Sequence, residues 1–385
     1  MKKYLLAAIL PWMMACEKED IDNPDDFIQT PASISDYLDL DLDNLYPYSD
    51  VSRPNFANSI VLDPLDNTPA DNPVTDEGAT LGRVLFYDVQ LSIDKSVSCS
   101  SCHVQANGFT DELRFSEGFD GGLTDMHSMR LANARFYSPG SMFWDKRAGS
   151  LEEQTSQPIQ HPVEMGFNES NGGMDSLLHR MEEIPYYPAL FEFVFGDDAI
   201  TETRMQLALA QFIRSMESWG SAFDEGFAQV FDPALPGGNA IADFPNLSDE
   251  ENLGKAIFLN PPPAGGAGCA GCHSLPALSL ADDSQTNGLD AGQDEVFKAP
   301  SLKNIALDGH LMHDGRFSTL EEVVEHYNSG IQDGPALDNR LRAPGGEPVQ
   351  LNLTIEEKAA LVAFLETLTD YNLIANPAFG DPFLD

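Results

Sequence analysis

The chain has 385 residues, which is enough for two or three domains that each bury a core. Its 62 Asp and Glu residues against 21 Lys and Arg residues give a formal net charge of -41. Such acidity argues against nucleic acid as a partner, because phosphate binding requires clustered Lys and Arg side chains. It is typical of a solvated acidic surface, and it favours attraction of a basic redox partner.

The N-terminus has the pattern of a secretion signal. Lys2 and Lys3 precede an apolar run from Leu5 to Met14 that is too short to span a bilayer, so residues 1–15 are interpreted as a signal peptide. The stretch Met13-Met14-Ala15-Cys16 resembles a lipobox, which implies cleavage before Cys16 and attachment of a lipid there. An ordinary signal peptide with an incidental cysteine is the alternative. The lipid anchor is favoured because the other four cysteines occur in paired motifs.

The segment that follows the signal shows little hydrophobic periodicity. Residues 16–72 are rich in Asp, Pro and Asn, and we interpret them as a lipid-anchored acidic tether and a surface extension. No later segment is long and apolar enough to cross a membrane. The sequence therefore predicts a periplasmic or cell-surface protein that is attached to the outer membrane only through a lipid on Cys16.

Two short cysteine motifs carry the strongest chemical signal. Both have the pattern Cys-x-x-Cys-His, which is the attachment motif of c-type haem. The two thiols of each motif can add to the two vinyl groups of a haem, and the following His can then ligate the iron. A shared zinc site or redox disulfides would leave both histidines unexplained, and chance would have to produce the motif twice. The predicted attachment cysteines are Cys99 and Cys102 in the first motif and Cys269 and Cys272 in the second, and the predicted iron ligands are His103 and His273.

The two motifs stand in a duplicated frame. Leu81-Gly82-Arg83-Val84-Leu85-Phe86 precedes the first motif, and Leu253-Gly254-Lys255-Ala256-Ile257-Phe258 precedes the second. Both read as short helices, and Ser248 with Glu251 forms a capping box for the second. We predict a mainly α fold with two cytochrome c-like helical domains, over residues 73–240 and 241–375, each around one covalent haem.

Three further helices are predicted from their apolar spacing. Leu209, Phe212, Ile213 and Met216 form one stripe, and a terminal helix starts at Thr354 with Leu361, Phe364, Leu365 and Leu368 on its buried face. A capping box from Ser318 to Glu321 starts the third, and its stripe is Leu320, Val323, Val324 and Tyr327. Tyr327 is therefore expected to point inward, and His326 lies off the stripe.

A series of stretches in matching order resembles the bacterial dihaem cytochrome c peroxidase and MauG superfamily. Besides the frame and both haem motifs, the matching stretches are Gly108-Phe109-Thr110-Asp111, Leu131-Ala132-Asn133, Phe143-Trp144-Asp145-Lys146-Arg147-Ala148, Pro162-Val163-Glu164-Met165-Gly166, Ala299-Pro300-Ser301-Leu302-Lys303-Asn304 and Met312-His313-Asp314-Gly315-Arg316-Phe317. The match runs from about residue 70 to residue 370. It is far more specific than either haem motif alone.

The resemblance implies unequal roles for the two haems. The haem on His103 is expected to react with hydrogen peroxide, and the haem on His273 to take up electrons. Trp144 matches the tryptophan that relays electrons between them. Glu164 matches the catalytic acid-base, whose pKa its apolar neighbours would raise, and Gln154 matches its partner glutamine. Taken alone, each of these residues would be read as ordinary core or surface.

The sixth ligand of the second haem is left open among three side chains. Conventional peroxidases of the family have a Met where Tyr327 aligns, whereas MauG-type members have a Tyr there. Alternatively, Tyr327 is an ordinary tyrosine of the hydrophobic core. Met312 and His326 are the alternative ligands.

Two further features of the family are missing from the aligned positions. Calcium is a candidate cofactor, but the aligned Asn is replaced by His127, for which Asp308 could compensate. A histidine that gates the peroxide haem would fall near Phe119-Asp120, where there is none. His127 is the single histidine of that loop, and it stands several residues too close to Asn133. We therefore expect the N-terminal haem to be five-coordinate or water-bound when oxidised.

Three function classes follow. The first is a cytochrome c peroxidase that reduces hydrogen peroxide to water with electrons from a small cytochrome c or copper protein. The second is a MauG-like oxidase of a protein substrate, and the third is a passive electron-transfer cytochrome. Gln154 with Glu164 favours either enzyme over the passive carrier, which needs no acid-base group. The resemblance also makes a homodimer a candidate assembly.

Overall fold

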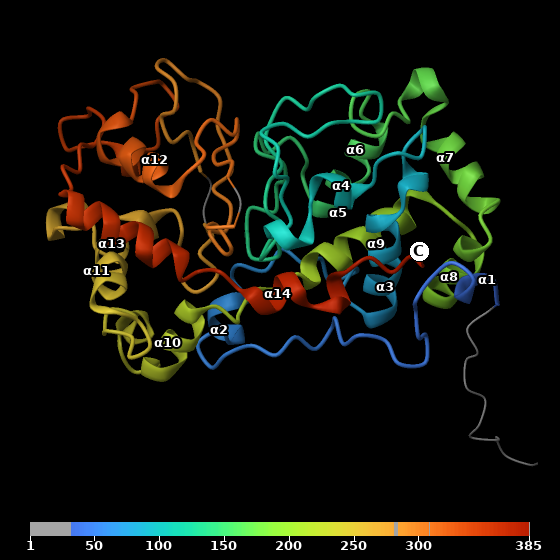
Figure 1. Ribbon diagram of the computed structural model, residues 1–385, viewed down its shortest axis with the longest axis horizontal. Helices are drawn as coiled ribbons and strands as arrows, with labels where there is room; N and C mark the ends of the chain where they lie inside the picture. Colours follow the sequence, from blue (N-terminus) through green and yellow to red (C-terminus); the bar gives the residue numbers. More distant parts are fainter. Residues whose placement is uncertain (1–31, 281–283, 308, 385) are drawn as a thin grey trace, which may run out of the picture.

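The computed structural model describes residues 32–280, 284–307 and 309–384 (Figure 1). The predicted signal peptide, Cys16 and Asp308 lie outside these residues. In the described part the chain is helical and pairs elsewhere only through isolated β-bridges, so the prediction of a mainly α protein is confirmed.

The helices fall into two groups that lie side by side in Figure 1, with α3 to α9 in one half and α10 to α13 in the other. Short 3-10 turns and loops connect them. The bounds are α1 Ala32–Ser35, α2 Ser59–Leu62, α3 Asp76–Tyr87, α4 Cys99–Cys102, α5 Leu151–Thr155, α6 Gln157–Gln160, α7 Gly173–Glu182, α8 Tyr186–Phe195, α9 Glu202–Ser215, α10 Ala222–Val230, α11 Asp249–Leu259, α12 Leu320–Glu325, α13 Ile355–Glu366 and α14 Tyr371–Ala375.

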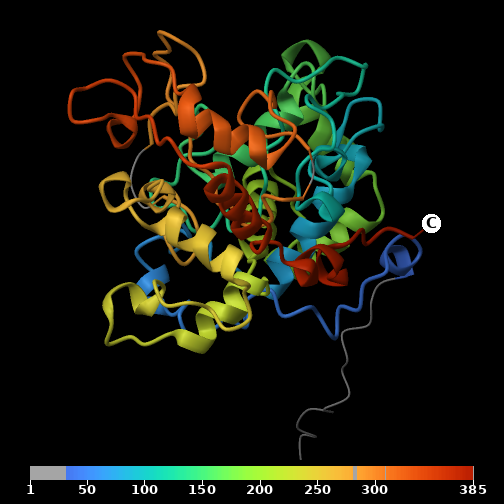
Figure 2. The ribbon, with the colours of Figure 1, turned by 60° about the vertical axis from the view of Figure 1, so that its left-hand side comes forward.

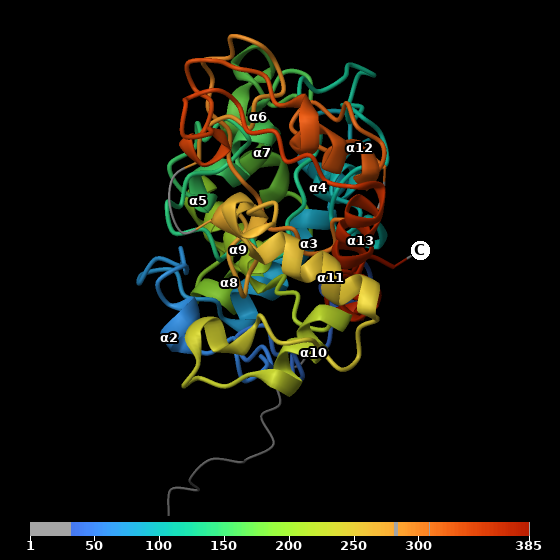
Figure 3. The same cartoon turned by 90° about the vertical axis from the view of Figure 1, so that its left-hand side faces the viewer.

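The duplicated frame corresponds to two closely crossing helix pairs. In the first half α3 packs against α9, and in the second half α11 packs against α13 (Figures 1 and 3). A Cβ on Gly82 would lie 2.1 Å from the carbonyl oxygen of Ala208, and a Cβ on Gly254 would lie 1.8 Å from that of Ala360. Each repeated Leu-Gly motif therefore places a glycine where two backbones approach too closely for any side chain.

Helix capping agrees with the sequence at most predicted starts. Ser248 with Glu251 caps α11, and Thr354 with Glu357 caps α13, each as a reciprocal capping box. The predicted box at Ser318 was wrong by one residue. Thr319 is the N-cap of α12 and pairs with Glu322, because Glu322 can reach back to the backbone of Thr319.

Two apolar clusters underlie the two halves. The first includes Leu81, Leu85 and Phe212, and the second includes Phe223, Phe258 and Phe364. Helix α10 contributes to the second cluster although it precedes residue 241, and the predicted domain limits stay a prediction.

Both ends of the described chain join the two halves. The N-terminal extension runs from α1, beside α8, to α2, beside α10 (Figure 1). The last residues return to the first half, where the Tyr48 hydroxyl donates to the carbonyl of Ala378 and the Arg83 guanidinium donates to that of Gly380. Figure 2 shows this tail beside the extension.

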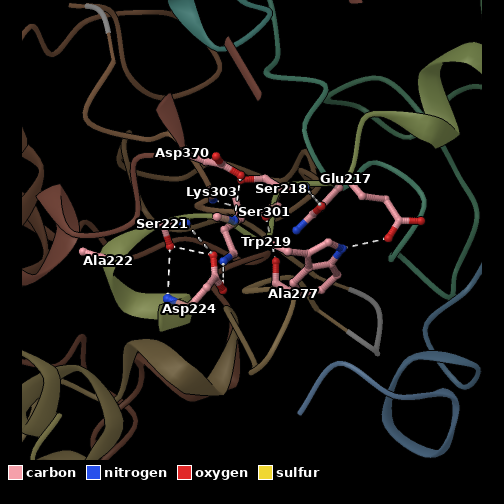
Figure 4. A network of polar contacts seen from close by, with 12 residues as sticks. Glu217, Ser218, Trp219, Ser221, Ala222, Asp224, Ala277, Ser301, Lys303 and Asp370 are labelled. Carbon is pink, nitrogen blue, oxygen red and sulfur yellow. Dashed lines mark hydrogen bonds and ion pairs between the residues drawn. The ribbon is translucent and has the colours of Figure 1, made fainter. Parts of the chain in front are cut away.

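A buried polar network fixes the connection between α9 and α10 (Figure 4). The Glu217 carboxylate accepts from the Trp219 indole at 2.7 Å and pairs with Arg53 at 2.6 Å. Lys303 and Asp224 form an ion pair in which both side chains are almost fully buried. Because loss of one partner of a buried pair typically costs about 3–5 kcal/mol, this pair locks the loop of Lys303 onto α10.

Candidate active site

The first cysteine motif lines a cavity of about 400 Å³ in the N-terminal half. The motif forms the short helix α4, whose N-cap Ser98 pairs with Ser101 in a capping box. The thiols of Cys99 and Cys102 and the ring of His103 all line the same cavity. The local turn therefore presents two thiols and an imidazole to one space, as the motif predicts.

The ring of His103 is held by its inner nitrogen. Nδ1 lies 3.0 Å from the carbonyl oxygen of Phe109 and 3.1 Å from the hydroxyl oxygen of Ser128. Burial lowers the pKa of His103, which favours the neutral ring. An imidazole whose Nδ1–H donates to a carbonyl presents a lone pair on Nε2, the arrangement that metal-ligating histidines use.

Two predicted side chains, Gln154 and Glu164, line the first cavity together with His103. Gln154 comes from α5, and Glu164 lies in the turn after α6. Burial raises the pKa of Glu164, and the facing His161 and Arg147 oppose that shift. The carboxyl group is therefore a stronger base than an exposed glutamate, in the direction that the sequence predicts.

His161 also lines this cavity, although no role for it was predicted from the sequence. Its Nδ1 lies 3.3 Å from Oε1 of Glu164, three residues further along the chain. The sequence signal for this contact is the i, i+3 spacing of His161 and Glu164, but such a spacing is common between residues that do not interact. The His161 ring therefore lies against the Glu164 carboxyl group in the lining of this cavity.

The second motif lines a separate cavity of about 390 Å³ in the C-terminal half. Cys269, Cys272 and His273 face this space, and Nδ1 of His273 lies 3.1 Å from the carbonyl oxygen of Pro300. Burial lowers the pKa of His273 to about 4. Because the two cysteine pairs occupy different cavities, a single zinc site built from all four thiols is excluded.

The three candidates for the sixth ligand of the second haem differ in whether they line the second cavity. Tyr327 and Met312 line the second cavity, and Asn287 donates to the Tyr327 hydroxyl at 3.2 Å and to the Met312 sulfur at 3.3 Å. His326 instead has its Nε2 3.1 Å from the carbonyl oxygen of Asn287 and does not line this cavity. The inward position predicted for Tyr327 is observed, and the geometry favours Tyr327 or Met312 over His326.

Each cavity fits a covalent haem. All four motif cysteines are free thiols, and burial raises the pKa of Cys99 and of Cys269 to about 12. Each pair faces a space that also receives a neutral imidazole with its outer nitrogen available. No cluster of three or more His, Cys, Asp or Glu side chains suited to a metal ion occurs in the described ranges, and calcium binding stays a prediction.

The two cavities share one wall. Trp144, His127, Arg130 and residues 298–301 line both of them. The Trp144 indole donates to the carbonyl of His127 at 2.7 Å, and the Trp144 carbonyl accepts from the amide of Lys298 at 2.8 Å. Trp144 therefore stands between the two haem sites, where the resemblance places a relay.

Lys298 is a second residue of the shared wall that the sequence did not single out. Its ammonium group lies 4.3 Å from the ring centroid of Tyr137, and burial lowers its pKa to about 7. A buried cation in a wall between two haem sites is suited to a haem propionate. A lone lysine before Ala299 carries no periodic signal, so only the structure reveals it.

Both ring nitrogens of His127 form hydrogen bonds within the protein, although the residue lines both cavities. Its Nε2 lies 3.1 Å from the Thr110 hydroxyl oxygen, and its Nδ1 lies 3.2 Å from the carbonyl oxygens of Leu113 and Arg114. Both ring nitrogens already have partners. This geometry supports the prediction that His127 does not close the first haem site.

Comparisons with known proteins agree with this site. The family model for di-haem cytochrome c peroxidase matches residues 76–229 and 248–384, so it covers both cavities. The chain belongs to the di-haem cytochrome c peroxidase family. Its members are haem oxidoreductases, and the predicted family is confirmed. The two cysteine pairs are those expected of a di-haem chain, which implies two c-type haems.

Relatives within the family include both MauG proteins and cytochrome c peroxidases. The chain is 33% identical to the methylamine utilization protein MauG of Methylorubrum extorquens over 78% of this chain and 80% of that protein. It is 29% identical to the cytochrome c551 peroxidase of Nitrosomonas europaea over 82% of this chain and 87% of that protein.

Solved structures show the same fold. A MauG-like protein associated with microbial copper homeostasis superposes with a TM-score of 0.66 at 30% identity, covering 88% of this chain and 98% of that one. The diheme peroxidase BthA from Burkholderia thailandensis superposes with a TM-score of 0.59 at 21% identity, covering 80% of this chain and 90% of that one. Among the helices that the structure describes, none has the length and apolar character to cross a membrane.

Proposed function

We propose that this chain reduces hydrogen peroxide to water in the first cavity with electrons that enter through the second. The observation that carries the proposal is the presence of Glu164 and Gln154 in the cavity that holds His103. One hydrogen peroxide takes up two electrons and two protons and gives two molecules of water. A passive electron carrier needs no such acid-base group beside its haem.

A haem held by His103 would supply the redox chemistry of oxygen–oxygen bond cleavage, and a haem held by His273 would supply the electrons. The Glu164 carboxylate accepts the proton of the inner peroxide oxygen and returns it to the outer, departing oxygen. Gln154 holds the peroxide through its side-chain amide, and His161 keeps the Glu164 carboxyl group in place. Trp144 conducts electrons between the sites, because it lines both cavities.

Two basic side chains of the shared wall would hold the haem propionates. Lys298 and Arg130 line both cavities and are suited to the carboxylates of the propionates. Apolar residues of the second cavity, such as Phe258 and Leu365, exclude water from the second site.

The position of Tyr327 supports a MauG-like oxidase of a protein substrate as the second candidate function. Its hydroxyl faces the second cavity, as expected for a tyrosine ligand. In this version a protein substrate is oxidised in place of a small donor. The 33% identity to MauG and the 30% identity to the MauG-like protein associated with copper homeostasis support it.

The cellular location of the protein is also proposed. We propose export, a lipid on Cys16 and a periplasmic or cell-surface site, where a small cytochrome c, a copper protein or a protein substrate can dock. Steady-state consumption of hydrogen peroxide with a reduced small cytochrome c tests the function. Turnover supports the peroxidase. Peroxide reaction without cytochrome oxidation supports the MauG-type version, and no reaction with peroxide contradicts both.

A further inference from the structure

A chain of three tyrosine rings leads from the apolar cluster of the first half to the protein surface. Tyr187 is fully buried, Tyr186 is 4% exposed, and Tyr37 is 44% exposed. The ring centroids of Tyr186 and Tyr187 are 4.7 Å apart, and those of Tyr37 and Tyr186 are 5.5 Å apart. Tyr37 lies in the turn after α1, and Tyr186 and Tyr187 begin α8, which lies beside α1 in Figure 1. Electron transfer falls steeply with distance, so rings in near contact form an efficient path.

The inner end of the chain lies in the apolar cluster against which Cys99 of the first haem motif packs. Tyr187 and Cys99 belong to the same apolar cluster. Burial and the Asp88 carboxylate raise the pKa of Tyr187, and the Cys99 thiol contributes to the same shift. The outer end lies on the extension that precedes α2, far along the chain from Cys99 but packed against α8.

One carboxylate serves both buried phenols. The hydroxyl groups of Tyr186 and Tyr187 both donate to Oδ2 of Asp88, at 2.6 Å and 2.5 Å. Asp88 is itself buried, and burial raises its pKa, which makes it a better proton acceptor than an exposed carboxylate. A phenol that loses an electron must also release its proton, and here the acceptor is already in contact.

We propose that Tyr187, Tyr186 and Tyr37 form a path along which oxidising equivalents leave the first haem site when no electron donor is bound. The proposal rests on the proposed function, because hydrogen peroxide is the oxidant. It assigns a protective role to the extension, which otherwise serves only to pack the two halves together.

The steps balance in electrons and protons. Tyr187 gives one electron to the oxidised first site and its phenolic proton to Asp88. Tyr186 then gives one electron to the Tyr187 radical, which recovers a proton from Asp88, while the proton of Tyr186 passes to Asp88. Tyr37 finally gives one electron to Tyr186 and releases its proton to water, and Asp88 returns the proton that it held. The net result is one electron gained by the first site, one neutral radical on exposed Tyr37 and one proton released to water.

A purely structural role for the cluster is the competing account. Asp88 ends α3, and its two hydrogen bonds join that end to α8. Replacement of Tyr by Phe separates the two accounts, because it keeps the ring packed and removes the redox-active phenol. Tyr37→Phe removes only an exposed hydroxyl, so it leaves the Asp88 cluster intact.

The test uses the full two-haem protein. Hydrogen peroxide is added without a donor in the presence of a nitroso spin trap, and trapped residues are located by peptide mass spectrometry. Absorbance of the haems is recorded in the same samples. The matched control is Tyr371→Phe, because Tyr371 is 70% exposed and stacks on no other described aromatic ring.

The wild type should show the trap on Tyr37 and little on Tyr371. Tyr187→Phe and Tyr186→Phe should each abolish the Tyr37 adduct while the haem absorbance still responds to peroxide, and Tyr371→Phe should change nothing. An unchanged Tyr37 adduct in both buried variants, or no adduct in a wild type whose haem responds, overturns the path alone. A wild type whose haem absorbance does not respond to peroxide overturns the proposed function and the path with it.

Discussion

The Trp144 indole nitrogen donates to the backbone carbonyl of His127 at 2.7 Å, and both residues line both cavities. This bond fixes the plane of the indole in the wall between the haem sites. Because the neighbouring residue Ser128 bonds to His103 at 3.1 Å, one short segment connects Trp144 to the first proximal ligand.

Replacing Trp144 by Phe should slow electron passage between the haems without loss of either haem. The phenyl ring keeps part of the packing but removes the indole and its hydrogen bond to His127. Stopped-flow absorbance of the half-reduced protein with peroxide measures the oxidation of the second haem. The first haem should still respond to peroxide at the wild-type rate. An unchanged rate at the second haem would remove Trp144 from the path.

Two haems should be covalently attached per chain. Denatured protein should retain both, and peptide mass spectrometry should find one on Cys99 and Cys102 and the other on Cys269 and Cys272. Cys269→Ala with Cys272→Ala should yield protein with the first haem alone. Protein that contains zinc and no haem, made with haem-attachment machinery present, would contradict the assignment.

Replacing Glu164 by Gln should slow the peroxide reaction by roughly 10²- to 10⁴-fold, the usual contribution of a positioned acid-base group. The active form is the carboxylate, and burial raises the pKa of Glu164 above its ordinary value. The wild-type rate should therefore fall as the pH is lowered through that raised pKa. The variant should lose this acidic limb.

A matched control for Glu164 is available on the surface. Glu169 lies on the 3-10 turn that follows the Glu164 segment and is solvent-exposed, so Glu169→Gln should leave the rate and its pH dependence unchanged. Near-normal turnover in Glu164→Gln would assign the proton transfer to another group, with His161 the next to test.

Replacing Tyr327 by Met should raise the reduction potential of the second haem. A methionine axial ligand favours the reduced iron, whereas a buried phenol that binds iron as phenolate favours the oxidised iron. Potentiometric titration measures the shift, and His326→Gln is the control because His326 does not line the cavity. An unchanged potential in Tyr327→Met, with a shift in Met312→Leu, would make Met312 the ligand.

The sequence predicted those parts of the site that are local in the chain. The cysteine motifs form single turns, and the boxes of Ser248 and Thr354 cap their helices, because each depends on residues within four positions. The repeated Gly82 and Gly254 were visible, but their reason was not. Only the fold shows the carbonyl groups of Ala208 and Ala360 against them.

The missed features depend on contacts between distant segments. Lys298 matters because its loop folds against Trp144, more than a hundred residues earlier, and the tail reaches Tyr48 through Ala378.

The shift of the predicted capping box from Ser318 to Thr319 has a local cause. Adjacent hydroxyl residues and adjacent glutamates allow two registers of the same box, and spacing alone does not choose between them.

We expect the first haem site to react with hydrogen peroxide in the fully oxidised resting protein, with no histidine to be displaced. Both ring nitrogens of His127 are occupied by Thr110 and by backbone carbonyls. The most direct test is electron paramagnetic resonance of the fully oxidised protein, before and after one equivalent of peroxide. We predict one high-spin and one low-spin ferric signal, with the high-spin signal lost on addition of peroxide. Two low-spin signals that persist until the second haem is reduced would contradict this expectation and make His127 the gating ligand.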